Sequence, residues 1–245
     1  MEFESLIQLF YGNLDKQGPG DDDISRSVLH SLPADRIHRI VDVGCGTGRQ
    51  TMLLARELKR PVFAIDTFFP FLKKVNEKAK LFKENITIVP VYMDMRELHL
   101  FFNRLDLIWC ESAVYNMGFE AALQAWYSAL VDQGFLVVSE LTWTKDVCPE
   151  ELRRYFMEMY TGMKTHRENM DLIKKHGYRL IQTEKLPESA WEEGYYEPLE
   201  KLSLNVIHHP DQDVRQYAQE TLKEIEIFRK CSEYYGYVFY VMQKL

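Results

Sequence analysis

The chain has 245 residues, of which 46% are hydrophobic, enough to fill the core of one large domain or two small ones. Thirty Lys and Arg against 37 Asp and Glu give a formal net charge of -7, so the sequence lacks the overall basic character of a nucleic-acid-binding protein. The four cysteines stand far apart with no Cys-x-x-Cys pair, which argues against a zinc knuckle or a disulfide-rich scaffold and fits a reducing compartment. Because there is no apolar run of about 18 residues and no basic N-terminal leader, we expect a soluble, cytoplasmic protein with no membrane association.

The first 32 residues read as two helices that form an N-terminal cap. Apolar side chains share one face of the first helix, from Phe3 to Phe10. Residues 17–20, with two glycines and a proline, break this helix. The acidic run at residues 21–23 then starts a second one, because negative side chains favour the positive end of the helix dipole.

Short β-branched runs alternate with longer helical patterns from residue 39 onward. This alternation is typical of a parallel sheet whose strands are joined by crossover helices. The predicted strands occupy residues 39–43, 62–66, 86–91, 105–110 and 135–140, and the predicted helices occupy residues 49–59, 69–82 and 119–130. Five strands in this order predict an open, doubly wound α/β sheet.

The chain after the fifth strand departs from this regular alternation. We expect a helix at residues 149–160, a helix ending at 176–177, a strand at 178–185, a long helical segment at 187–235 and a closing strand at 237–242. No Ser/Gly-rich linker separates these pieces. We therefore predict a single domain, residues 1–245, made of the cap at 1–32, a core at 35–185, a helical lid at 187–235 and a closing strand at 236–245.

The most informative stretch is the glycine-rich turn at residues 44–48, between the first predicted strand and the first crossover helix. Glycine allows positive φ and lets a ligand approach the bare backbone. A dinucleotide site would have the spacing G-x-G-x-x-G, whereas this turn has G-x-G-x-G followed by Arg49 and Gln50, which weakens a nicotinamide interpretation. A turn kept only for tight packing of strand and helix is the alternative.

At this turn the sequence resembles the class I S-adenosylmethionine-dependent methyltransferases, whose first motif is an acidic residue followed by G-x-G-x-G. The resemblance spans residues 35–141, roughly, at the level of motifs. It implies a Rossmann-like, seven-stranded, mostly parallel sheet with an antiparallel last strand, S-adenosylmethionine as cofactor and S-adenosylhomocysteine as product. The cofactor-binding residues that it implies are Gly44, Cys45, Gly46, Gly48, Asp66, Thr67, Asp94, Met95 and Glu111.

Two acidic residues after later strands fall in the order that the resemblance requires. Asp66 ends the second predicted strand, where a carboxylate can accept both hydroxyls of a ribose. Read alone, Asp66 is as well suited to be the N-cap of the helix that follows. Asp94 and Met95 follow the third strand, where the family uses a polar side chain and a backbone N–H against adenine, and an ordinary loop aspartate is the alternative.

The fourth predicted strand leads into Glu111, Tyr115 and Asn116, which match the family motif beside the transferred methyl group. Strand ends are where such sheets bind ligands, so Glu111 and Tyr115 are the candidate catalytic residues. Aromatic side chains favour a nearby sulfonium. The candidate acceptor-binding residues are Tyr11, Tyr115, Asn116, Trp191 and Tyr195. Packing in the core, or cover for an exposed sheet edge, is the alternative role for these side chains.

Residues 17–20, 191–198 and 233–237 resemble segments of a narrower group, largely uncharacterised bacterial and archaeal methyltransferases often labelled as ubiquinone-biosynthesis-like. That label says little about the acceptor. We expect methyl transfer by in-line displacement to a small-molecule acceptor, for which the protein aligns the nucleophile and excludes water.

Other functions stay open at this point. Arsenite methylation would need several thiolates together, and methylation of RNA would favour a basic face, whereas the basic run at residues 73–83 fits a solvated helix side. A methyltransferase acting on a protein and a non-catalytic S-adenosylmethionine-binding protein are further alternatives. The seven histidines form no metal-binding pair, so no metal site is predicted, and His30 is an outside candidate for a general base. The oligomeric state is also left open, and a homo-oligomer is possible.

Overall fold

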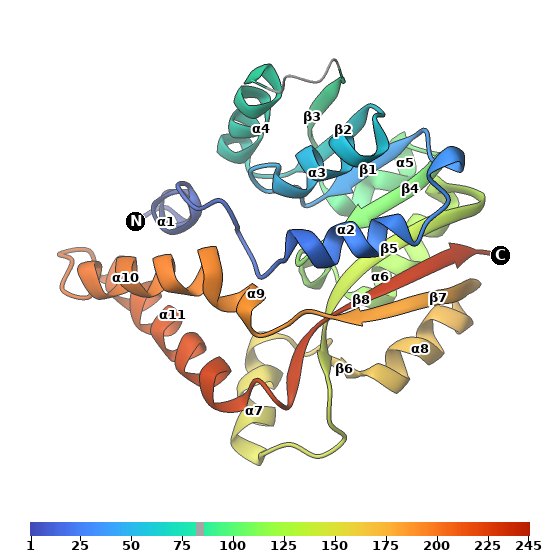
Figure 1. The fold of residues 1–245 in the computed structure, drawn as a ribbon. Helices are drawn as coiled ribbons and strands as arrows, with labels where there is room; N and C mark the ends of the chain where they lie inside the picture. The colour runs from blue at the N-terminus through green and yellow to red at the C-terminus, as the bar shows by residue number, and fades with distance from the viewer. Residues whose placement is uncertain (82–85) are drawn as a thin grey trace.

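A sheet with helices on both faces forms the centre of the molecule (Figure 1). The computed structural model describes residues 1–81 and 86–245. In these residues the strand order is β3-β2-β1-β4-β5-β8-β7, and β6 pairs only with β5. The strands are β1 (Ile40–Val43), β2 (Val62–Asp66), β3 (Ile88–Tyr92), β4 (Leu105–Cys110), β5 (Leu130–Trp143), β6 (Lys164–Thr165), β7 (Tyr178–Lys185) and β8 (Tyr235–Lys244).

The strand pairing confirms the predicted fold class. β3, β2, β1, β4 and β5 are parallel neighbours, and β8 lies antiparallel between β5 and β7. The order of the strands reverses between β1 and β4, because the chain first builds outward to β3 and then returns to the other side of β1. In sheets of this kind, the crevice beyond the carboxyl ends of the strands at such a reversal is where ligands bind.

Helices and helical turns cover the sheet and extend beyond it (Figure 1). The helices are α1 (Phe3–Tyr11), α2 (Asp22–His30), α3 (Arg49–Leu58), α4 (Phe69–Leu81), α5 (Leu98–Phe101), α6 (Phe119–Trp126), α7 (Glu150–Met159), α8 (His166–Lys175), α9 (Ser189–Trp191), α10 (Glu197–Val206) and α11 (Gln212–Cys231). The short turns are η1 (Ala34–Arg36), η2 (Met95–Glu97), η3 (Val114–Asn116), η4 (Tyr127–Ala129) and the π-helical η5 (Glu192–Tyr196).

The strands are apolar on both sides because both faces of the sheet are buried. Along β4, Leu107 and Trp109 belong to the core on one face, while Ile108 and Cys110 belong to the core on the other. The first core continues into the N-terminal cap and the C-terminal helices, so these added segments share a core with the sheet.

The structure differs from the predicted elements mainly around β5. α6 ends at Trp126 rather than at residue 130, and β5 already begins at Leu130, which pairs with Leu105 of β4. The polar residues 132–134 resemble a turn, and Gln133 does adopt a positive φ of 62°, yet the strand continues through them. β6 has two residues and adds an eighth strand to the predicted seven. Phe82, the predicted end of the second crossover helix, and Lys83 lie outside the described residues.

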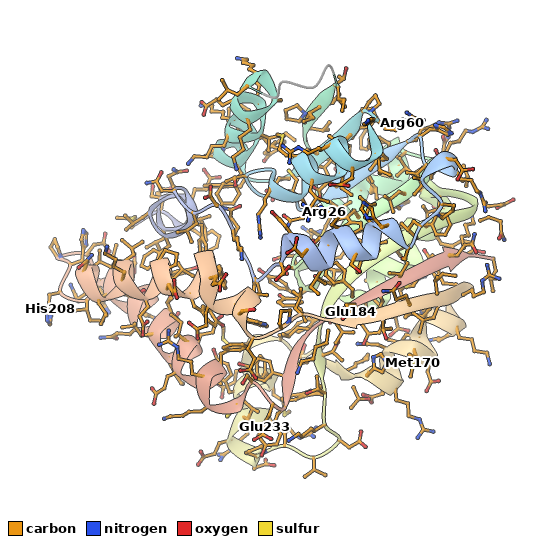
Figure 2. All side chains as sticks on the ribbon, in the orientation of Figure 1. Arg26, Arg60, Met170, Glu184, His208 and Glu233 are labelled. Carbon is orange, nitrogen blue, oxygen red and sulfur yellow. The ribbon has the colours of Figure 1, made fainter. Side chains whose placement is uncertain are left out.

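The N-terminal and C-terminal segments meet beside the sheet. α1 lies next to the antiparallel pair α10 and α11, at the left of Figure 1. His208, in the turn between α10 and α11, lies at the far tip of this pair (Figure 2). The division of the chain into cap, core, lid and closing strand stays a prediction. No helix in the described part of the chain is both long enough and apolar enough to cross a membrane.

Candidate active site

The glycine turn after β1 needs glycine at each of its three positions. Gly44, Gly46 and Gly48 have φ values of +68°, +53° and +85°, in the left-handed region that other residues rarely adopt. A Cβ on Gly44 would lie 2.5 Å from the Cβ of Ala113, so the loop after β4 closes tightly on the turn. The backbone N–H groups of Gly44 and Cys45 both donate to the carbonyl of Ile65, which fixes the turn beside the end of β2.

The Asp66 carboxylate at the end of β2 is held against this turn. Its Oδ2 accepts the backbone N–H of Gly46 at 2.9 Å, and its Oδ1 accepts that of Phe68 at 2.8 Å. The Phe68 bond closes a local turn just before α4, which begins at Phe69, and the Gly46 bond ties the same carboxylate to the glycine turn. Partial burial raises the pKa of Asp66.

A cavity of about 720 Å³ opens over the carboxyl ends of β1, β2, β3 and β4, a volume in the range of small-molecule sites. Its wall combines the strand-end loops with parts of the N-terminal segment, η5 and α11. The predicted site residues that line it are Tyr11, Gly44, Cys45, Gly46, Asp66, Thr67, Asp94, Met95, Glu111, Tyr115, Asn116 and Tyr195.

Gly48 and Trp191, two further predicted site residues, are not in this wall. A Cβ on Gly48 would lie 3.0 Å from a methyl carbon of Val75, so this glycine allows α3 and α4 to approach each other. Trp191 is only 5% exposed and stacks on Phe228 and Tyr237, with ring centroids 4.4 and 5.3 Å away. Trp191 therefore packs in the core beside the cavity rather than in it.

Asp94 and Asn116 make local bonds in the strand-end loops. Asp94 is the N-cap of η2, and both of its oxygens also meet Arg96 Nε at 3.0 Å. The Arg96 guanidinium lowers the pKa of Asp94. The side-chain amide of Asn116 donates to the carbonyl of Ala113 at 2.9 Å, whereas Tyr115 is 46% exposed and contacts Tyr160 edge to face.

Glu111 forms the point where α2 and α3 are joined to the end of β4. Its Oε2 accepts the hydroxyl of Ser25 at 2.9 Å and the indole N–H of Trp109 at 3.3 Å, and its Oε1 accepts the amide of Gln50 at 3.1 Å. Burial raises the pKa of Glu111 to about 7. With both oxygens occupied, this carboxylate positions the cap against the sheet.

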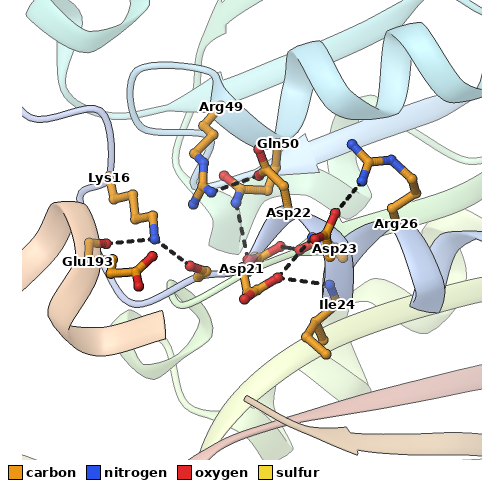
Figure 3. Close-up of polar contacts among 12 residues, drawn as sticks. Lys16, Asp21, Asp22, Asp23, Ile24, Arg26, Arg49, Gln50 and Glu193 are labelled. Carbon is orange, nitrogen blue, oxygen red and sulfur yellow. Dashed lines mark hydrogen bonds and ion pairs between the residues drawn. The ribbon is translucent and has the colours of Figure 1, made fainter. Parts of the chain in front are cut away.

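Arg49, in the first turn of α3, carries an unused donor in the cavity wall. Its guanidinium forms an ion pair with Asp22 of α2 at 2.9 Å (Figure 3). Its buried Nη1 has no hydrogen-bond partner among the described residues. Lys16 lies near it and donates to the carbonyls of Gly20 and Glu193 at 2.7 Å each, which joins the N-terminal segment to η5 (Figure 3).

Gln17 is a wall residue for which the sequence assigned no role. Its Oε1 accepts the backbone N–H of Thr47 at 2.9 Å, and its amide donates to the carbonyl of Leu14 at 2.8 Å. A Cβ on Gly46 would lie 2.7 Å from the same Oε1. The segment at residues 17–20 stood out in the sequence, but nothing local predicts that it covers the glycine turn 30 residues later.

Two lysines of the basic run on α4 face the protein, which corrects the expectation of a solvated helix side. Lys74 donates to the carbonyl of Gly12, and Lys78 meets Thr47 Oγ1 at 3.3 Å. Both side chains are half-buried and fasten the N-terminal segment and the glycine turn to α4. Lys73 and Lys80 of the same run are exposed, as expected of a solvated helix side.

The other residues considered for catalysis or metal binding are not brought together at one site. His30 is outside the cavity wall and pairs with Glu57 at 2.8 Å on the surface. The four cysteines are free, and of these only Cys45 lines the cavity. Within residues 1–81 and 86–245, no group of three or more His, Cys, Asp or Glu residues is arranged to hold a metal ion.

Comparisons with known proteins agree with this geometry. Residues 40–134 match the family model described as a methyltransferase domain. The fold is similar to that of an S-adenosylmethionine-dependent methyltransferase from Geobacter sulfurreducens in complex with S-adenosylhomocysteine, with a TM-score of 0.79, 13% identity and 98% of each chain covered. A second such enzyme, from Thiobacillus denitrificans and in complex with the same ligand, gives a TM-score of 0.79 at 15% identity and covers 100% of both chains.

Residues 40–134 therefore form a methyltransferase domain, and the chain as a whole has the fold of class I methyltransferases. The predicted fold and the methyltransferase assignment are thereby confirmed. Both structural neighbours hold S-adenosylhomocysteine, the demethylated product of the predicted cofactor.

Among individual proteins, the chain is similar to the uncharacterized methyltransferase YodH of Bacillus subtilis (strain 168). The two sequences are 24% identical over 229 residues, which cover 92% of this chain and 93% of that protein. The similarity therefore includes the N-terminal and C-terminal segments as well as the central domain, and it leaves the acceptor undefined.

Proposed function

We propose that the protein transfers a methyl group from S-adenosylmethionine to a small-molecule acceptor by in-line displacement. One observation carries this proposal: the same cavity is lined by the glycine turn, Asp66 and Asp94 and also by the aromatic residues Tyr11 and Tyr195. Such a cavity offers a cofactor and an acceptor adjoining places out of bulk water, and alignment and exclusion of water are what this displacement needs.

The residues present fit S-adenosylmethionine. The glycine turn lies in the cavity wall, and the fixed Asp66 carboxylate beside it has lone pairs left for the two ribose hydroxyls. The unpartnered Nη1 of Arg49 is a donor for the cofactor's carboxylate, since a buried donor without a partner is costly. When bound, S-adenosylmethionine supplies an activated methyl carbon on a positively charged sulfur.

The protein's part in the reaction is to hold the cofactor and the acceptor in place and to keep bulk water out of the cavity. Gln17 and Lys16 keep the N-terminal segment closed over the glycine turn, and Glu111 keeps α2 against the strand ends. Because the Glu111 carboxylate joins Ser25 of α2 and Gln50 of α3 to the end of β4, we assign this residue to positioning. Tyr115, which is partly exposed and follows β4, remains the proposed contact to the acceptor.

A two-stage assay tests the proposal. The purified protein is first titrated with S-adenosylhomocysteine, and then incubated with S-adenosylmethionine and pools of small amines, phenols and carboxylic acids while S-adenosylhomocysteine formation is followed. We expect binding in the first stage and turnover with one pool in the second. Binding without turnover on any small-molecule pool, but with turnover on RNA or protein, would replace the small-molecule acceptor with a macromolecule. Binding without any turnover would indicate a non-catalytic binder.

A further inference from the structure

Tyr195 of η5 places an unused hydroxyl group in the cavity wall. The side chain is only 8% exposed and stacks on the ring of Tyr196, with centroids 5.1 Å apart. Its hydroxyl has no hydrogen-bond partner among the described residues, yet it is not sealed in the core as the orphaned hydroxyl of Ser203 is. Because Tyr195 lines the cavity, the open space at this hydroxyl is the cavity. A hydroxyl on a side chain so deeply buried needs a partner, which a bound molecule can supply there.

Lys16 adds a positive charge to the same part of the wall. Its stem lies over Gly194, the residue before Tyr195, since a Cβ on Gly194 would lie 3.6 Å from Lys16 Cε. Its ammonium group donates to the carbonyls of Gly20 and Glu193 at 2.7 Å each (Figure 3). An ammonium group has three N–H donors, so one donor of Lys16 has no partner among the described residues. Lys16 and Tyr195 are therefore neighbouring residues of the cavity wall.

The charge of Lys16 is not neutralised by an ion pair. Among the described residues no carboxylate lies within ion-pair distance of its ammonium group, and Asp21, Asp22 and Glu193 act on it only from farther away. Burial and the nearby Arg49 guanidinium lower the pKa of Lys16. The two carbonyl oxygens satisfy donors but bring no negative charge. A half-buried ammonium group in this state is stabilised by an anion that enters the cavity.

The surroundings of this pair are largely apolar or aromatic. The other lining side chains of this kind on α1 and α11 are Phe3, Ile7, Tyr11 and Tyr217. The hydroxyls of Tyr11 and Tyr217 bond to each other at 3.1 Å, which leaves one proton of the pair free to donate. The acidic lining residues Glu4 and Asp15 are exposed, so solvent screens their charge. This part of the wall suits a molecule that has an apolar body and an anionic group.

We propose that the methyl acceptor is a small organic anion with an apolar or aromatic body, whose carboxylate or phosphate group is held by Lys16 and the hydroxyl of Tyr195. This inference rests on the proposed function and names its class of acceptor. The ammonium group supplies the opposite charge and a free N–H donor, and the hydroxyl supplies a second donor. Hydrogen bonds to an ionised oxygen are stronger than those between neutral groups, so this pair selects an anion over a neutral molecule of the same shape.

Phenylacetate and phenylacetamide test this inference, because they have nearly the same shape and differ in charge. Each is titrated into the protein saturated with S-adenosylhomocysteine. Phenyl phosphate is titrated in the same way, and the tighter of the two anions identifies the preferred group. We expect this anion to bind at least about tenfold more tightly than the amide.

Two variants assign the preference to its residues. Lys16→Gln should remove most of the preference for the anion, because glutamine can still donate to the two carbonyls but carries no charge. Tyr195→Phe, which keeps the ring, should weaken binding of the preferred anion by about tenfold. Tyr92→Phe, the same change at a 67% exposed position outside the cavity wall, is the matched control and should leave all affinities unchanged.

Each outcome decides a different claim. Equal binding of the anions and the amide, or a preference that survives Lys16→Gln, would overturn the anion inference. An anion affinity that falls as the S-adenosylhomocysteine concentration rises would place the anion in the cofactor site and overturn it as well. Failure of the wild-type protein to bind S-adenosylhomocysteine would instead contradict the proposed function. If Lys16→Gln does not fold, Tyr195→Phe decides, since an unchanged anion affinity in that variant also overturns the inference.

Discussion

Asp66 is tied by its two oxygens to the N–H groups of Gly46 and Phe68, so its direction is fixed before any ligand arrives. We predict that Asp66→Ala weakens S-adenosylhomocysteine binding by about 1.5–3 kcal/mol, the scale of a lost charge-assisted hydrogen bond. Calorimetric titration measures this, and thermal unfolding of the same variant is the control. A loss of stability as large as the loss of affinity would favour a helix-capping role over ribose binding.

Glu140 on β5 gives a prediction about pH. It is fully buried, Tyr160 donates to its Oε1 at 2.7 Å, and its Oε2 has no partner among the described residues. Burial raises the pKa of Glu140 to about 8. In the unfolded chain the carboxyl group titrates near pH 4.3, so its contribution to stability is fully present below that pH and is lost as the pH rises through about 8.

We therefore expect Glu140→Gln to lose less stability than the wild type between pH 5 and pH 8.5, by about 4 kcal/mol, because each pH unit between the two pKa values contributes about 1.4 kcal/mol. Denaturant unfolding at several pH values measures how steeply the free energy of unfolding falls with pH in the variant and in the wild type. Asp42 and Glu111, whose pKa values burial also raises to about 7, are unchanged in both proteins and therefore cancel. Parallel stability curves would show that Glu140 is ionised in the folded protein.

Single residues were predictable from the sequence where a strand leads directly into them. Asp66 and Glu111 follow strands, and the carboxyl ends of parallel strands meet at one edge. Gln17 reaches the site through the packing of a segment distant in the sequence, which no local pattern encodes. Trp191 shows the converse, since an aromatic residue in an added segment can pack in the core beside a cavity without entering it.

At the scale of elements, α2 supports the cavity wall from behind, because Ser25 meets Glu111 and Asp22 meets Arg49. Asp21 starts this helix by accepting the N–H groups of Asp23 and Ile24 at 2.9 and 3.0 Å. We predict that Asp21→Ala lowers the free energy of unfolding by about 1 kcal/mol, the usual value of an N-cap.

Asp23→Ala is the matched control for this prediction in urea denaturation. The Asp23 side chain is 92% exposed and pairs only with Arg26, so its removal should change stability by about 0.5 kcal/mol or less. Equal effects of the two substitutions would show that the charge of the acidic run, rather than the cap geometry of Asp21, stabilises α2.

The segment at residues 187–235 has two roles: Trp191 packs in the core, and Tyr195 lines the cavity. We predict that Trp191→Ala lowers the free energy of unfolding by about 3–5 kcal/mol, as large-to-small changes of buried aromatic residues do. Urea denaturation measures this, and Tyr195→Phe, which keeps the ring, should stay close to wild type. A small effect of Trp191→Ala would show that the segment is loosely attached.

The boundaries of elements were less predictable than their order. Alternation of β-branched and helical patterns predicted the parallel core, because each crossover needs its own helix. The start of β5 at Leu130 was missed, since its pairing with Leu105 overrides the polar, turn-like residues 132–134. β6 has two residues and exists only through its pairing with the end of β5, so it is too short for any periodicity to show.

At the scale of the whole molecule, the reversal of strand order between β1 and β4 places four strand-end loops around one cavity, and the two chain-terminal segments complete its wall. The order of the strands was readable from the sequence. The closing of residues 1–32 and 187–235 over the same cavity was not, because it depends on contacts between segments about 200 residues apart, such as the bond between Tyr217 and Tyr11.

The most direct test of the central claim, that this cavity holds S-adenosylmethionine, is calorimetric titration of the wild-type protein with S-adenosylhomocysteine and, separately, with NAD. We predict one S-adenosylhomocysteine per chain and no heat from NAD, because the turn has the spacing G-x-G-x-G rather than the G-x-G-x-x-G of a dinucleotide site. Saturation at 100 times the dissociation constant should also stabilise the fold by about 2.7 kcal/mol. Binding of NAD together with no binding of S-adenosylhomocysteine would contradict the account.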